Sequence, residues 1–197
     1  MPAVKPDLET ADAVAKPILI RAGVALIFGL TTVFVQEPST LWMKVAFALY
    51  LVFSGSAMWE YLRREPVPVA MRSPLSMAAA AWMLGTIVLL FLSAPQAIGL
   101  TVAAALAVGG VAELVAWFGH RRAFLPARDQ LITGLAGLGS GVALALGSHL
   151  NPHGQLGIVG GGAIIIGTLL AVSGVGMALD VRKARNLEAD RAPGRVD

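Results

Sequence analysis

The chain has 197 residues, of which 56% are hydrophobic and only 14% are charged, and its mean hydropathy is +0.73. Because soluble domains carry about 25% charged residues, this composition excludes a soluble globular protein with an ordinary charged surface. The absence of cysteine excludes disulfides, thiolate catalysis, iron–sulfur clusters and zinc sites with thiol ligands.

Six apolar runs follow one another along the chain, and each is long enough to cross a bilayer core about 30 Å thick. Apolar and polar residues do not alternate within them, so they are typical of helices rather than transmembrane strands. The sequence therefore predicts an all-α polytopic membrane protein with six transmembrane helices. The runs cover residues 18–35, 41–62, 75–92, 97–118, 131–150 and 156–179.

Three pairs of one glycine and one proline recur at a fixed interval along these runs. The glycines are 56 residues apart and the prolines 57, and the pairs are Gly29 with Pro38, Gly85 with Pro95, and Gly141 with Pro152. A period of this length indicates that one structural unit is used three times. We expect three helical hairpins, over about residues 18–64, 75–122 and 130–185, each with a proline in its turn.

The returning helices of these units share a further glycine. It is Gly55 in the first unit, Gly110 in the second and Gly174 in the third, although Gly167 fits the period better. Small residues let helix backbones approach closely in a membrane. The candidate helix-packing positions are Gly29, Gly85, Gly137, Gly141, Gly157 and Gly161.

Two of these glycine pairs, Gly137–Gly141 and Gly157–Gly161, have the four-residue spacing of a close-packing helix face. We interpret them as tight packing between the fifth and sixth helices of one subunit. An interface between copies of the chain and a glycine-lined pore are the two alternatives.

The basic residues lie almost entirely on one side of the predicted membrane. Of the 15 Lys and Arg residues, only Lys44 falls on the side of the proline turns. The positive-inside rule places both termini and the two longer loops in the cytoplasm, and this distribution accounts for the basic charge without a nucleic-acid partner. We expect residues 1–17 to form a cytoplasmic segment, 18–185 the membrane domain and 186–197 a disordered cytoplasmic tail.

The tryptophans agree with this orientation. Trp59 and Trp117 stand at the predicted inner ends of their helices and Trp42 at an outer end, where aromatic rings are expected at headgroup depth. Trp82 lies deeper in the third run, and we expect it to pack between helices.

Arg21 and Glu113 are the two ionisable residues that fall well inside predicted spans. Charges within a membrane are costly, which makes both candidate functional residues. Both lie toward the cytoplasmic side, so their depth permits an ion pair. The pair is either structural, with snorkelling to the headgroups as a variant, or it contains a carboxylate that responds to protons. Glu60, Asp129 and Asp180, beside arginines at helix ends, are expected to be interfacial.

His149 and His153 are four residues apart in the third proline turn. On a helix this spacing would place both imidazoles on one face, but Pro152 argues against a regular helix there. A surface loop is one interpretation, and a pH-responsive pair and a metal site are the alternatives.

A set of short motifs recurs in the units. The first unit has Arg21, Gly23, Phe28–Gly29, Pro38, Gly55 and Arg63–Arg64; the second keeps Gly85, Pro95, Gly110, Glu113 and Arg121–Arg122; the third keeps Gly141, Pro152 and Arg182. Over about residues 18–185 the chain thereby resembles the HdeD-like family of acid-resistance membrane proteins. It departs from that pattern in two places, because the arginine of the first unit has no counterpart in the others and the third turn is longer.

The resemblance implies a bacterial inner-membrane protein that is associated with stress or acid resistance in some members and has no known catalytic mechanism. The expected function is therefore a non-enzymatic one without cofactor or metal, in contact with the lipid bilayer and with a homo-oligomer or a larger membrane complex as possible assemblies. A small transporter or channel is the alternative. An enzyme of lipid or peptide chemistry is the third, and the chain lacks a phosphate loop, H-E-x-x-H and G-x-S-x-G.

Overall fold

The computed structural model describes residues 7–122 and 124–191, and this part of the chain is built from six α-helices. Each helix is long and apolar enough to cross a membrane. The prediction of an all-α polytopic protein with six transmembrane helices is confirmed. The helices are α1 (Leu8–Phe34), α2 (Thr40–Leu62), α3 (Val69–Leu90), α4 (Pro95–His120), α5 (Ala127–Leu146) and α6 (Pro152–Arg191).

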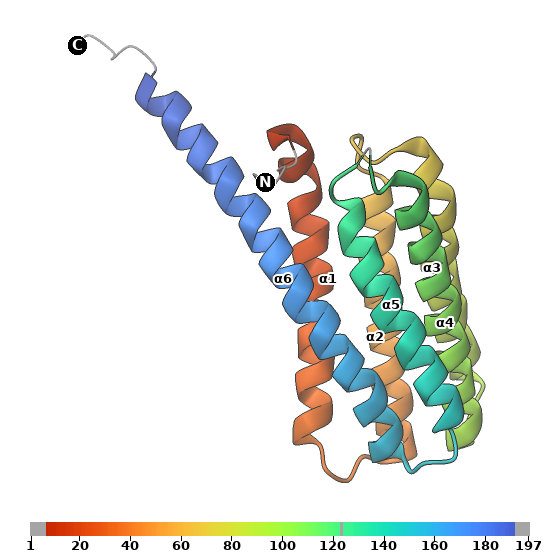
Figure 1. The fold of residues 1–197 in the computed structure, drawn as a ribbon. Coiled ribbons are helices and arrows are strands. Elements are labelled where there is room, and N and C mark those ends of the chain that lie inside the picture. The colour runs from red at the N-terminus through yellow and green to blue at the C-terminus, as the bar shows by residue number, and fades with distance from the viewer. Residues whose placement is uncertain (1–6, 123, 192–197) are drawn as a thin grey trace.

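The helices run alternately up and down, so that both ends of the described chain lie at the same end of the bundle (Figure 1). Each helix packs against the one before it, and α6 packs along α1, which closes the bundle into a ring. The most extensive pairs are α1 with α6 and α4 with α5. These pairs join different units of the expected repeat, so each helix packs across units as well as within its own hairpin.

The recurring prolines stand at or just before helix starts. Pro95 and Pro152 are the first residues of α4 and α6, where a missing N–H costs no hydrogen bond. The side chain of Asn151 accepts from the Gly154 N–H at 2.8 Å at the start of α6. Ser39, which follows Pro38, accepts from the Trp42 N–H at 3.1 Å. The regularly spaced prolines thus mark the positions where the chain turns back into the helix bundle.

Two helices, α1 and α3, begin well before the apolar runs. α1 begins at Leu8, capped by Asp7, whose carboxylate accepts from the Thr10 N–H at 2.7 Å and from its hydroxyl at 3.0 Å. These hydrogen bonds hold the pKa of Asp7 below its ordinary value. α3 begins at Val69 rather than near residue 75. Polar residues at these helix starts lower the local hydropathy, so a prediction from apolar length alone places the starts too late in the sequence.

The sixth helix is the longest, with 40 residues and therefore a length of about 60 Å. That is about twice the thickness of a bilayer core. It leans across α1 and projects past the other helices at the end with the termini (Figure 1). The helix includes residues 186–191 of the expected tail; residues 192–197 lie outside the described part.

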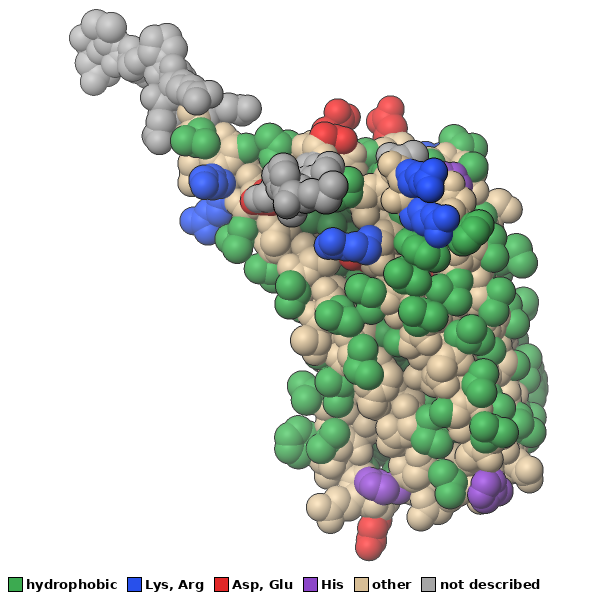
Figure 2. Space-filling model, viewed as in Figure 1, with side chains coloured by type: hydrophobic (Ala, Val, Ile, Leu, Met, Phe, Trp, Pro, Cys, Tyr) green, Lys and Arg blue, Asp and Glu red, His purple; other side chains and the backbone are tan. Residues whose placement is uncertain are grey.

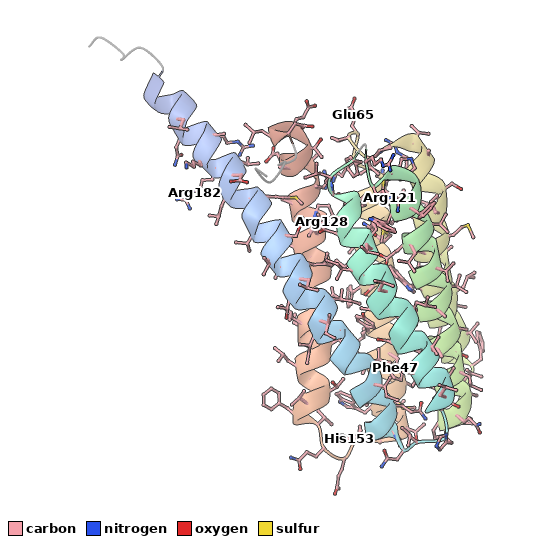
Figure 3. All side chains as sticks on the ribbon, in the orientation of Figure 1. Phe47, Glu65, Arg121, Arg128, His153 and Arg182 are labelled. Atoms are coloured by element: carbon pink, nitrogen blue, oxygen red, sulfur yellow. The ribbon has the colours of Figure 1, made fainter. Side chains whose placement is uncertain are left out.

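The surface divides into an apolar middle and charged ends. Blue and red side chains gather at the end where the termini lie, and green side chains cover the middle (Figure 2). Ile27, Leu84 and Val172 are among the apolar residues more than half exposed. We call the end that carries Arg121, Arg128 and Arg182 the basic end (Figure 3).

Three glycines of the returning helices meet the backbone of the next helix around the ring. A Cβ atom at Gly110 would lie 2.5 Å from the Leu138 nitrogen, and one at Gly55 would lie 3.3 Å from the Ala79 oxygen. Gly167 meets α1, where a Cβ atom would lie 2.9 Å from the Leu26 nitrogen. The expected Gly174 instead faces side chains of α1. Gly167, rather than Gly174, therefore shares with Gly55 and Gly110 a close approach to a neighbouring backbone.

The candidate packing glycines divide by partner. A Cβ atom at Gly29 would lie 2.9 Å from the Gly160 oxygen of α6, and one at Gly141 would lie 2.8 Å from the Ala103 oxygen of α4. A Cβ atom at Gly85 would lie 2.9 Å from the Ala105 Cβ of α4. These three glycines therefore lie at close helix crossings.

The other candidates require a correction. Gly137 makes ordinary contacts with α4 rather than α6, since a Cβ atom there would lie 3.7 Å from the Leu106 oxygen. Gly157 and Gly161 have no neighbour among the described residues within 4 Å of such a Cβ atom, so the predicted close packing at this pair is wrong. The two helices meet instead where Gly162 faces Ser140. A four-residue glycine spacing does not say which face of a helix is covered.

Candidate functional site

The structure brings Arg21 of α1 and Glu113 of α4 together as an ion pair. Arg21 is 8% exposed and Glu113 is completely buried. A charge this deeply enclosed is stable only because its partner lies beside it.

Trp82 of α3 also lies against Arg21. The guanidinium carbon is 5.0 Å from the centroid of the indole ring, within the range of a cation–π interaction. Trp82 is 4% exposed, which confirms the prediction that it packs between helices. The ring fits there because it lies on Gly109, one turn before Glu113, where no side chain stands in its way. The arginine thus contacts both a carboxylate and an aromatic face.

The first turn of α5 adds a second buried acid. Asp129 is 6% exposed and accepts a hydrogen bond from the Ser173 hydroxyl of α6 at 2.8 Å. Its neighbours Gln130 and Thr133 are also buried. Asp129 is therefore enclosed between helices at the start of α5, and its expected depth at the membrane interface stays a prediction. An acid in the first helical turn is favoured by the positive end of the helix dipole, and here the same residue connects α5 to α6.

A small cavity lies between these groups and α2. Its volume is about 10 Å³, room for about one water molecule. Its polar lining residues are Arg21, Tyr61, Asp129 and Gln130. The Tyr61 hydroxyl and the Gln130 side-chain oxygen are buried without a hydrogen-bond partner in the described part of the chain. Polar walls with two unsatisfied groups suit a bound water.

All six helices contribute to this set of polar side chains, which we call the polar cluster and which is buried except for the half-buried Ser173. Its members are Arg21 of α1, Tyr61 of α2, Trp82 of α3, Glu113 of α4, Asp129, Gln130 and Thr133 of α5, and Ser173 of α6. The cluster joins opposite charges, hydroxyls and one amide within a closed bundle. Such an arrangement can fix helix positions and can exchange protons with a single water.

The two histidines occupy a different region. His153 lies in the first turn of α6 at the end opposite the basic end (Figure 3), and its Nδ1 is 3.2 Å from the Val35 oxygen. His149 lies in the preceding turn, and both side chains are exposed. Within the described residues no group of three His, Asp or Glu side chains is placed to hold a metal.

Sequence reasoning identified the charged pair but missed most of the cluster. Asp129, Gln130 and Thr133 form a polar patch on one face of a helix start, a signal that was available in the sequence. The predicted fifth span began at residue 131, so Asp129 and Gln130 fell outside it. Ser173 and Gly109 carry no signal of their own, because small residues are common in membrane helices.

No family model, curated protein or solved structure matches this chain. The function must therefore be argued from the site and the surface.

Proposed function

We propose that this integral membrane protein is non-enzymatic, resides in a bacterial inner membrane with both termini in the cytoplasm, and acts in stress response or as an accessory subunit of a membrane complex. Its resemblance to HdeD-like proteins rests on the residues of the repeat alone. Of the two proposed roles, the one in acid stress is the more specific consequence of that resemblance.

The enclosed polar cluster is the observation that carries the proposal. Arg21 and Glu113 neutralise each other, Asp129 is bonded to Ser173, and the cavity beside them has room for about one water. A substrate site would need a larger cavity with convergent free polar groups. The cluster instead has the character of a structural core that holds six helices in place.

Two experiments test this proposal. Deleting the gene should lower survival at acid pH, and re-expression should restore it; unchanged survival would count against an acid role. Purification in a mild detergent followed by native mass measurement should reveal a stoichiometric partner if the protein is an accessory subunit. A clean monomer from the same preparation would count against that role.

A small transporter or channel is the second candidate, and one observation favours it. The polar cluster takes a residue from every helix, as expected where a solute path is built between helices. In proteoliposomes, a transporter should raise the flux of protons or a small ion above that of empty liposomes. Equal fluxes over a panel of ions would remove this candidate.

A further inference from the structure

A cleft opens between the N-terminal half of α1 and the distal half of α6, at the basic end of the bundle. Its volume is about 690 Å³. Its lining residues come from α1 and α6 alone, and α6 leans away past α1 at this end of the bundle (Figure 1). The side chains that line it include Asp12, Lys16 and Leu19 of α1 and Val181, Arg182 and Arg185 of α6.

The α1 wall changes from charged to apolar along its length. Asp12 and Lys16 come first, and Leu19 and Ile20 follow about one turn deeper into the bundle. Lys16 is exposed, whereas Leu19 is only partly so. A molecule lying along this wall would therefore meet a cation near the end of the bundle and hydrocarbon below it.

The α6 wall has the same gradient because the two helices run in opposite directions. Ala178 and Val181 lie deeper, and Arg182 and Arg185 follow toward the end of the helix. Both arginines are exposed, and Val181 is buried. The charged residues of the two walls thus lie at the same depth of the cleft, and so do the apolar residues.

The charges across the cleft do not cancel. Arg185 pairs with Asp12 at 2.8 Å and links α6 to α1. Lys16 and Arg182 form no ion pair with another described residue, and both line the cleft. Two cations above an apolar channel match a ligand that has a negative headgroup and hydrocarbon tails.

We propose that this cleft binds an anionic phospholipid. Lys16 and Arg182 contact the phosphate headgroup, and an acyl chain lies along Leu19, Ile20 and Ala178. A basic residue near a membrane surface attracts anionic lipid by about 1 kcal/mol, so two of them together favour it over a zwitterionic lipid by more than tenfold. The Asp12–Arg185 pair closes one side of the headgroup position and keeps the two helices at the distance that the lipid requires.

The test measures lipid retained by the full-length protein. The protein is reconstituted with equal amounts of phosphatidylglycerol and phosphatidylcholine, extracted in mild detergent and weighed by native mass spectrometry. The double variant Lys16→Gln/Arg182→Gln should retain about tenfold less phosphatidylglycerol than the parent. The control, Arg121→Gln/Arg122→Gln, removes the same charge at the same end but outside the cleft, and should retain it nearly unchanged.

A third variant separates a lipid from a free phosphate. Ala178→Trp fills the apolar part of the cleft and leaves both cations in place, so it should lose phosphatidylglycerol as well. Inorganic phosphate at millimolar concentration should not displace the bound lipid from the parent protein. Equal losses in the cleft and control variants, unchanged binding by Ala178→Trp, or displacement by phosphate would each overturn the proposal. Thermal unfolding of each variant shows whether it folds. If the double variant fails to fold, the single variant Lys16→Gln takes its place.

Discussion

The Arg21–Glu113 pair joins the first and fourth helices, which are not neighbours in the chain. A buried ion pair gains Coulomb energy at the cost of desolvating two charges, so its net contribution to stability is small. Removing only one partner is different, because the other charge then stays enclosed without compensation. The effects on stability of substituting Arg21 and Glu113 should therefore be strongly coupled to each other.

A double-mutant cycle measures this dependence. Arg21→Met and Glu113→Leu should each destabilise the protein by about 3–5 kcal/mol, and the double variant by much less than the sum. Thermal unfolding in a fixed detergent gives the stabilities. The half-exposed Glu60–Arg64 pair of the same bundle is the control, and Glu60→Gln should cost less than about 1 kcal/mol. Additive effects of Arg21→Met and Glu113→Leu would show that the pair is not energetically coupled.

The indole of Trp82 occupies the space above Gly109, and this gives a second prediction. Gly109→Ala places a methyl group into the ring, and such overpacking costs about 1–3 kcal/mol. Gly119→Ala on the same helix meets no atom of a described residue within 4 Å, so it should be neutral or stabilise α4 by up to about 1 kcal/mol. Thermal unfolding of both variants decides between them. Equal melting temperatures would argue against this packing of the ring.

Two members of the polar cluster, Arg21 and Glu113, were predictable, and the hydroxyl groups of Tyr61 and Ser173 were not. Arg21 and Glu113 stand out because ionisable residues are rare within apolar runs. Tyr61 and Ser173 do not, because hydroxyls are tolerated on either face of a membrane helix. The burial of Asp129 was not predictable, because Asp129 lies at a helix start, where acids are common for reasons of capping and dipole alone.

At the scale of helices, glycines decide how closely neighbours approach. At Gly167 a side chain would meet the Leu26 nitrogen and the Ala22 oxygen of α1, at 2.9 and 3.0 Å. Backbone atoms cannot turn aside as a flexible side chain can. The crossing of α6 over α1 therefore depends on the absence of a side chain at this position.

Gly167→Ala should accordingly destabilise the bundle by about 1–3 kcal/mol, through strain at the α1–α6 contact. Gly157→Ala is the matched control, ten residues earlier on the same helix with open space around it. That change should be neutral or slightly stabilising, because alanine favours a helix over glycine by about 1 kcal/mol. Unfolding in detergent, monitored by loss of monodisperse protein on heating, compares the two. Destabilisation by Gly157→Ala of similar size would show that this face is covered.

The length and composition of the helices were predictable, but the faces by which they pack were not. In water, a polar stripe marks the exposed face of a helix. In a lipid bilayer both faces are apolar, so the sequence pattern of α5 or α6 does not distinguish Gly141, at a crossing, from Gly161, in the open. For the same reason the sequence does not predict that α1 packs against α6, the contact between the first and last helices that closes the ring.

At the scale of the whole molecule, charge separates the two ends of the bundle. Basic side chains gather where the termini lie, and the loops at the other end carry almost none (Figure 2). Because cytoplasmic loops of membrane proteins are enriched in Lys and Arg, the basic end should face the cytoplasm. The even number of spans then puts both termini on that side.

The chain lacks cysteine, so single introduced cysteines report this orientation without background. Glu37 and Ser93 are exposed in loops at the end opposite the basic end, and Glu65 and Leu125 are exposed in loops at the basic end. In intact cells a membrane-impermeant maleimide should label Glu37→Cys and Ser93→Cys. It should label Glu65→Cys and Leu125→Cys only after the membrane is opened. Labelling of all four variants in intact cells would show that the basic end is accessible from outside the cell. Labelling of only Glu65→Cys and Leu125→Cys in intact cells would contradict the proposed orientation.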